Sequence, residues 1–214
     1  MSLRKSRPVP SPQPSPTRGE GVKVRRARMG DVKAMHQLLN SFADKRELLP
    51  RSISEVYENL QQFFIAEHKK KIIGTCALYV TWDNLAEVKA LAVEEKFQGQ
   101  GIGKRLLSAV MQVAKDLHIR RLFTLTIRTG FFEHFDFKHV SKDHLPHKVW
   151  TECVKCVYFP DRCVEYAMVK DLPGQGPRPP PIAFRKKIAP SKDLPVGTIV
   201  PSEPLVPGVS IHKP

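Results

Sequence analysis

The sequence predicts one α/β domain, built on a mixed, mostly antiparallel sheet with helices on both faces. Segments of strand and helix periodicity alternate in the order β-α-α-β-β-β-α-β-α-β-β. A glycine-rich turn joins the fourth strand to the next helix. Prolines set the limits of the domain: of 19 in all, five lie in residues 8–16 and eleven in residues 173–214. We therefore place the domain at residues 22–172.

The two ends of the chain differ in composition from this central segment. Proline-rich segments with few aromatic side chains bury too little apolar surface to offset the entropy lost on ordering. We expect residues 1–21 and residues 173–214 to be disordered tails.

The first half of the expected domain contains two helices and a hairpin. Apolar and polar residues alternate over 22–26, which predicts a strand. The apolar residues of 32–42 recur at helical spacing, which predicts a helix. Ser52 and Glu55 match a capping box, which predicts a second helix through Leu60. Residues 63–67 and 72–80 read as a hairpin whose turn carries three lysines.

The second half begins with a strand at residues 85–93. Residues 103–117 follow as a helix with one broad apolar face. Further elements are expected as a strand at 121–127, a short helix at 131–135, and strands at 137–140 and 164–169.

The glycine-rich turn predicts an anion site. Its glycines, Gly99, Gly101 and Gly103, let consecutive amides point at one spot, and the following helix adds its positive N-terminal end. A tight turn without a ligand looks similar. A dinucleotide fold would place such a turn after the first strand, and the chain has no P-loop Gly-Lys-Ser/Thr sequence.

The spacing Q-x-x-G-x-G from Gln98 to Gly103 resembles the coenzyme A pyrophosphate turn of the GNAT superfamily of N-acetyltransferases. The resemblance covers residues 22–172 and implies the GNAT fold, with acetyl-CoA as co-substrate. In this family the pantetheine arm of coenzyme A binds to the exposed backbone of the fourth strand, and the pyrophosphate binds to backbone amides of the turn. The residues so implied are Leu91, Ala92 and Val93 for the arm, and Gln98, Gly99, Gln100, Gly101, Ile102, Gly103 and Lys104 for the pyrophosphate.

The resemblance also implies a general base, Glu87, in the fourth strand. A base is needed because acceptor amines are protonated near neutral pH; a solvated strand carboxylate is the alternative. The family often has a Tyr general acid in the short helix after the fifth strand, where this chain has Phe132, which has no proton to give. Solvent, the protonated amine or another side chain would then supply the proton, and His134 and Tyr158 are the candidate side chains.

Several segments resemble one branch, the amino-acid acetyltransferases typified by N-acetylglutamate synthase, in its short single-domain form. These are Leu48-Leu49-Pro50-Arg51-Ser52, Ala86-Glu87-Val88-Lys89, Leu125-Thr126-Ile127-Arg128-Thr129 and Leu145-Pro146-His147-Lys148. The resemblance implies L-glutamate as acceptor, in the first step of arginine biosynthesis. It implies that cations bind the substrate carboxylates, and we expect these to be Arg51, Lys89, Arg128 and Lys148.

Other functions stay open. One is a GNAT enzyme that acetylates a protein, a polyamine or a drug amine, for which an acidic pocket is expected. Another is a non-catalytic module that senses coenzyme A or binds a partner, which the missing Tyr at Phe132 and the proline-rich tails would suit.

Cys153, Cys156 and Cys163 lie near the end of the domain, with His144 and His147 just before them. Such a set suits a zinc site, a redox-sensitive thiol cluster or inert packing. We expect packing or thiol chemistry, and no metal.

Charge and hydropathy limit the partners. The net charge of the whole chain is +14. Residues 22–172 hold 25 Lys and Arg against 18 Asp and Glu, so the domain carries only half of this positive charge. No nucleic-acid motif is present, and no apolar run reaches membrane length. We expect a cytoplasmic enzyme with a small-molecule partner and no nucleic-acid or membrane partner; a homodimer is compatible with the sequence.

Overall fold

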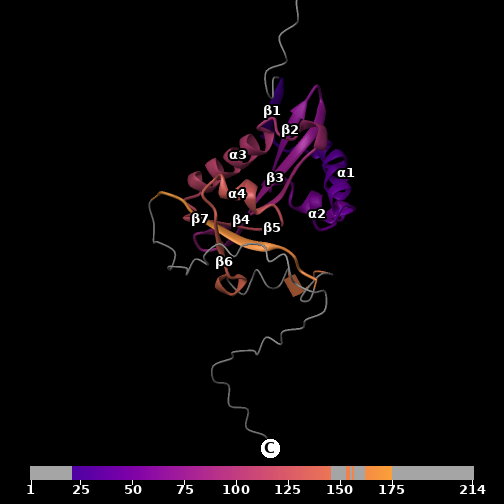
Figure 1. The fold of residues 1–214 in the computed structure, drawn as a ribbon. Coiled ribbons are helices and arrows are strands. Elements are labelled where there is room, and N and C mark those ends of the chain that lie inside the picture. The colour runs from indigo at the N-terminus through magenta and orange to yellow at the C-terminus, as the bar shows by residue number, and fades with distance from the viewer. Residues whose placement is uncertain (1–20, 146–152, 155, 157–161, 175–214) are drawn as a thin grey trace, which may run out of the picture.

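The computed structural model describes residues 21–145, 153, 154, 156 and 162–174 of the chain (Figure 1). Seven strands of this part form one open sheet in the order β1-β2-β3-β4-β5-β7-β6. The β4–β5 pair is parallel and the other pairs are antiparallel. The mixed, mostly antiparallel sheet predicted from the sequence is confirmed.

The elements follow one another in the predicted order. The strands are β1 (Val22–Arg26), β2 (Phe63–His68), β3 (Lys71–Trp82), β4 (Leu85–Val93), β5 (Arg121–Thr126), β6 (Lys138–Val140) and β7 (Tyr166–Asp171). The α-helices are α1 (Val32–Ala43), α2 (Ile53–Glu58), α3 (Ile102–Asp116) and α4 (Thr129–Glu133). Short 3-10 turns occupy Met29–Asp31, Leu60–Gln62, Glu95–Phe97 and Lys142–His144.

Two elements begin two residues away from the start that the sequence predicted, and β3, α3 and β6 begin one residue away from it. The last strand was expected from Val164, but Val164 is 68% exposed and the ladder with β5 starts at Tyr166, opposite Thr126. Helix α4 was expected from Phe131 and begins at Thr129. The apolar Val164 lies outside the β7 ladder, whereas α4 includes Thr129 and Gly130 ahead of its first apolar residue, so periodicity alone misplaces both boundaries.

Helices cover both faces of the sheet (Figure 1). Helices α1 and α2 pack on one face, where Met35, Leu39 and Val56 join Phe63 and Ile65 in one core. Helix α3 packs on the opposite face in a second core, which includes its residues Leu106, Leu107 and Val110. The two cores hold the sheet from both sides, and its middle strands run between them.

A helix cap and an ion pair fix the loop between α1 and α2. The Ser52 hydroxyl accepts a hydrogen bond from the Glu55 amide at 3.1 Å, as the sequence predicted for a helix start. The Glu55 carboxylate contacts Arg51. The loop from α1 to α2 is thereby tied to the start of α2. Among the described residues, no helix has both the length and the apolar content that a bilayer crossing requires.

Candidate active site

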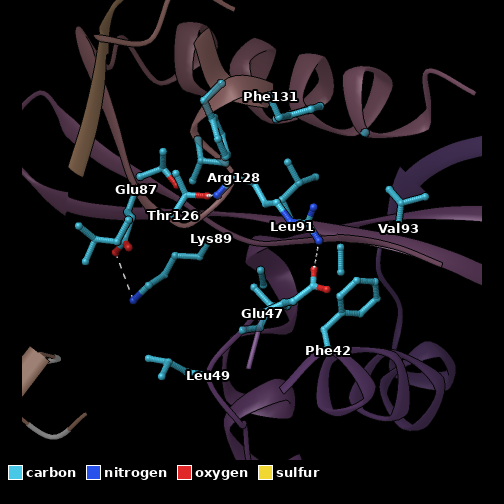
Figure 2. A pocket seen from close by; sticks show the side chains of 18 of the residues that line it. Phe42, Glu47, Leu49, Glu87, Lys89, Leu91, Val93, Thr126, Arg128 and Phe131 are labelled. Carbon is cyan, nitrogen blue, oxygen red and sulfur yellow. Dashed lines mark hydrogen bonds and ion pairs between the residues drawn. The ribbon is translucent and has the colours of Figure 1, made fainter. Parts of the chain in front are cut away.

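Strands β4 and β5 separate part of the way along their length. Their parallel ladder runs from Leu85–Arg121 to Glu87–Phe123 and continues no further, whereas β4 stays paired with β3 up to Val93. The β5-facing edge of β4 after Glu87 is therefore left without a neighbouring strand. It borders a cleft of about 1310 Å³ (Figure 2).

A bulge shifts the side chains of β4 as it enters the cleft. Lys89 pairs with Ala77 and Ala92 with Thr75, so β4 has one residue more than β3 in this stretch. Ala90 takes the left-handed conformation, with φ at +51°, and its carbonyl accepts a 2.8 Å hydrogen bond from the Thr75 hydroxyl. The buried hydroxyl thereby holds the bulge in place.

The glycine-rich turn closes one end of the cleft. Gly99 and Gly101 have φ of +72° and +79°, which other residues rarely adopt. Gly101 is the N-cap of α3, and no side chain caps this helix. The side-chain amide of Gln98 donates to the Val93 carbonyl at 2.8 Å, which fixes the turn to the end of β4.

The first amides of α3 have no partner within the helix, because hydrogen bonds begin with the Arg105 amide donating to the Gly101 carbonyl at 3.1 Å. A Cβ on Gly103 would lie 3.2 Å from the Phe131 ring, so backbone and ring are in close approach here. The arrangement fits an anionic group at the helix N-terminus.

Glu87 lies where β4 and β5 separate, with 7% of its surface exposed. Its carboxylate is 3.2 Å from the Lys89 ammonium (Figure 2). Burial raises the pKa of Glu87 to about 7 even though Lys89 lowers it; the Glu165 carboxylate adds to the rise and Arg51 opposes it. A carboxylate with this pKa can take and release a proton near neutral pH.

Each predicted substrate cation in the described part of the cleft faces a carboxylate. Arg51 contacts Glu55, four residues on. Lys89 contacts Glu87, and its ammonium also lies 5.1 Å from the centre of the Tyr79 ring. The Arg128 guanidinium reaches across the cleft to Glu47 at 2.8 Å (Figure 2). The structure thus brings Arg51, Lys89 and Arg128 to one cleft; Lys148 lies outside the described residues.

Comparisons with known proteins identify the family of this chain. The model of the acetyltransferase (GNAT) family matches residues 32–137. The uncharacterized N-acetyltransferase CT2212 of Chlorobaculum tepidum is 36% identical over 151 residues, or 70% of this chain and 96% of that protein. The chain belongs to the GNAT family of acetyltransferases.

Other relatives of this acetyltransferase have more specific names. The amino-acid acetyltransferase of Mycobacterium tuberculosis is 38% identical over 132 residues, which cover 60% of this chain and 75% of that protein. The solved structure of Rv2747 from the same organism, in complex with CoA and NLQ, has a TM-score of 0.62 and 32% identity, and covers 70% of this chain and 99% of its own.

A longer relative shares the fold over part of its length. N-acetylglutamate synthase from Neisseria gonorrhoeae, complexed with coenzyme A and N-acetyl-glutamate, has a TM-score of 0.64 and 27% identity. The match covers 71% of this chain and 35% of that protein. The GNAT fold predicted from the sequence is thereby confirmed.

Phe132 stands where the resemblance to the family implies a Tyr general acid, and it is a core residue of this acetyltransferase. Phe132 is 4% exposed and packs edge-on against Phe131 and Phe137. His134 lines the cleft, and its Nδ1 lies 2.5 Å from the Gly130 carbonyl oxygen. Tyr158, the other alternative, lies outside the described residues.

The cysteines of the acetyltransferase lie at the same cleft. Cys153, Cys156 and Cys163 line it, whereas His147 lies outside the described residues. Within the described residues, no group of three or more His, Cys, Asp and Glu side chains is arranged to hold a metal ion.

Two cleft carboxylates were not singled out from the sequence. Glu165 lies just before β7 and reaches the cleft because β7 pairs with β5. Burial raises its pKa, while Lys142 and Lys89 oppose the rise. Glu47 lies in the loop between α1 and α2. No local motif marks either residue; their position follows from how distant elements meet.

Proposed function

We propose that this acetyltransferase moves an acetyl group from acetyl-CoA to the α-amine of L-glutamate, the first step of arginine biosynthesis. Residues 22–172 form the catalytic domain of the proposal. Acetyl-CoA is the co-substrate, and the acceptor is an amino acid. The single observation that carries the proposal is the junction of β4 and β5, where a buried carboxylate meets an open strand edge.

Acetyl-CoA supplies an activated acyl group with a thiolate leaving group. In the proposal its pantetheine arm lies along the backbone of Leu91, Ala92 and Val93, the edge that β5 leaves uncovered. Its pyrophosphate lies against the amides of residues 98–104, where the first α3 amides have no partner within the helix. The two contacts follow one continuous wall of the cleft.

Glu87 acts as general base in this proposal. It takes a proton from the acceptor ammonium, and the neutral amine attacks the thioester carbon; the C–N bond forms, the C–S bond breaks, and the thiolate takes a proton from solvent. The pKa of about 7 suits both halves of this cycle. The proton leaves Glu87 for bulk water before the next turnover. No general acid is needed at Phe132, because a thiolate is a tolerable leaving group.

The proposed acceptor site combines cations and carboxylates. Arg51, Lys89 and Arg128 would bind the two carboxylates of glutamate, with Lys148 as a further proposed contact. A substrate carboxylate would displace or share the present partners, Glu55, Glu87 and Glu47. The ion pairs keep the cations in the cleft until the substrate arrives.

The deciding experiment incubates the purified full chain with acetyl-CoA and each of the twenty amino acids separately. N-acetylated products are measured by mass spectrometry. We expect N-acetylglutamate to form at the highest kcat/KM. If a different N-acetyl amino acid forms and glutamate gives no product, the proposal of glutamate as acceptor is wrong. The proposal of acetyl transfer to an amino acid then stands.

A cationic amine is a second candidate acceptor, and a specific observation favours it. Glu87 and Glu165 both border the cleft; the charge of Glu165 raises the pKa of Glu87, and Lys89 lowers the pKa of both carboxylates. Two carboxylates suit an acceptor with more than one ammonium group. Spermidine and lysine side-chain amines therefore belong in the same assay, and acetylation of spermidine above glutamate would select this candidate.

Arg51→Ala is expected to raise the KM for glutamate by about 10- to 100-fold, since a charged hydrogen bond contributes about 1.5–3 kcal/mol. The KM for acetyl-CoA should change less than threefold, because the turn and the β4 edge are untouched. Steady-state kinetics with each substrate varied in turn measure both values. Arg51→Lys should recover part of the loss.

The matched control is Arg46→Ala, at an exposed position of the same loop that does not line the cleft. Its two KM values should stay at those of the wild type. Equal increases in both KM values for Arg51→Ala would argue that Arg51 holds the loop and does not bind glutamate.

A further inference from the structure

The cleft carries three thiols that the proposed reaction does not use. Cys153, Cys156 and Cys163 line it together with Glu87 and Glu165. They form one local cluster: the charges of Cys163, Glu165 and Glu87 all act on the thiol of Cys153. The thiols therefore lie at the end of the cleft where the acceptor amine meets the base.

One of these thiols has a cation beside it. The Lys142 ammonium donates to the sulfur of Cys163 at 2.9 Å. Lys142 comes from the 3-10 turn Lys142–His144, so the contact joins this turn to the cleft-lining segment that holds Cys163. A neighbouring ammonium favours the thiolate, which is the form that attacks disulfides.

Among the residues that the structure describes, no other cysteine sulfur accepts a hydrogen bond from an ammonium group. Cys76 is fully buried in β3, and burial raises its pKa far above the usual value. Burial also raises the pKa of Cys153, against an opposing effect of Lys142. Cys163 thus combines half-buried access, a place in the cleft and a directly contacting ammonium.

We infer that Cys163 is a thiol-modification site, and that a low-molecular-weight disulfide forms a mixed disulfide there and blocks the acceptor end of the cleft. The Cys163 thiolate attacks one sulfur of the disulfide; a new S–S bond forms, the old S–S bond breaks, and the second sulfur leaves as a thiolate. The added group then occupies the cleft beside Glu87 and Glu165.

The inference depends on the proposed function only for the position of the acceptor. Its chemistry is read from the protein itself, so labelling can be measured without turnover. If glutamate gives no product, the proposed function fails and the labelling result stands. If Cys163 is not labelled, the inference fails and the proposed function stands.

The test uses the full chain and oxidised glutathione as the probe. Samples are quenched with iodoacetamide over time, and peptide mass spectrometry locates the mixed disulfide. We expect Cys163 to be modified first and Cys76 to stay unmodified until the protein is unfolded. Transfer activity should fall in step with the labelling of Cys163 and return with dithiothreitol.

Lys142→Met tests the role of the ammonium. Methionine is similar in length but cannot donate to the sulfur, which the ammonium contacts at 2.9 Å. We expect labelling about threefold slower in Lys142→Met, because no cation then lies beside the attacking sulfur. Lys115→Met, on α3 and away from the cleft, is the matched control and should label at the wild-type rate.

Cys163→Ser completes the test, with each variant compared with its own untreated sample and its melting temperature checked. Treated Cys163→Ser should keep the activity of its untreated sample. First labelling at Cys153 or Cys156, full activity of a protein labelled at Cys163, or unchanged labelling in Lys142→Met would each overturn the inference.

Discussion

Glu87→Gln is expected to lower kcat/KM for the acceptor by about 10²- to 10⁴-fold, the usual contribution of a positioned general base. Glutamine keeps the shape of the side chain but takes no proton at neutral pH. Only the small fraction of acceptor that is already neutral would then react. Steady-state kinetics at pH 7 measure the loss.

The pH dependence gives the same prediction an independent readout. Because burial raises the pKa of Glu87 to about 7, its carboxylate is the main form above this pH and is lost as the pH falls. Wild-type kcat/KM should therefore drop about tenfold per unit below pH 7 and level off above it. Glu87→Gln should lack this transition.

Glu58→Gln is the control for this pair of measurements, since Glu58 ends α2 at an exposed position outside the cleft. It should keep both the wild-type rate and the wild-type pH profile. If Glu87→Gln shows the same fall of kcat/KM below pH 7 as the wild type, another group causes that fall. Glu165, whose pKa burial also raises, would be the first to examine.

Gly101→Val is expected to raise the KM for acetyl-CoA by at least tenfold. Its φ of +79° is strained for any residue with a Cβ and most of all for a branched one, so the turn must change shape. Loss of even one amide contact to a phosphate would account for the factor. The KM for glutamate should change little, because the acceptor end lies away from the turn.

Gly101→Ala should give a smaller increase in the same direction. The control is Gly30→Val, at a position where an added Cβ meets no atom within 4 Å. Isothermal titration with CoA separates binding from turnover, and melting curves show whether α3 still forms. Wild-type CoA affinity in a folded Gly101→Val variant would remove the turn from the proposed binding site.

Local patterns were sufficient to predict the order of the elements and the place of the turn. The bounds of β1 and β4 match the prediction, because alternation there coincides with ladder pairing. The role of Ser52 as a helix cap was also visible, since a cap depends on neighbours in sequence.

Contacts between distant segments were not visible in the sequence. The pairing of β7 with β5 brings Glu165 to the cleft, and the Arg128–Glu47 contact joins residues 81 positions apart. The bulge at Ala90 could not be predicted either, because alanine gives no signal for a left-handed conformation. A likeness to a family was needed to single out Glu87, which lies at the last pair of the ladder between β4 and β5.

The parallel ladder between β4 and β5 also bears on how the sheet is held together. Three residue pairs of this ladder join β4 to β5. One apolar core adds to them, because it includes Ile73 of β3 together with Leu122 of β5 and Met168 of β7. The open edge of β4 after Glu87 therefore does not divide the domain into two separately packed parts.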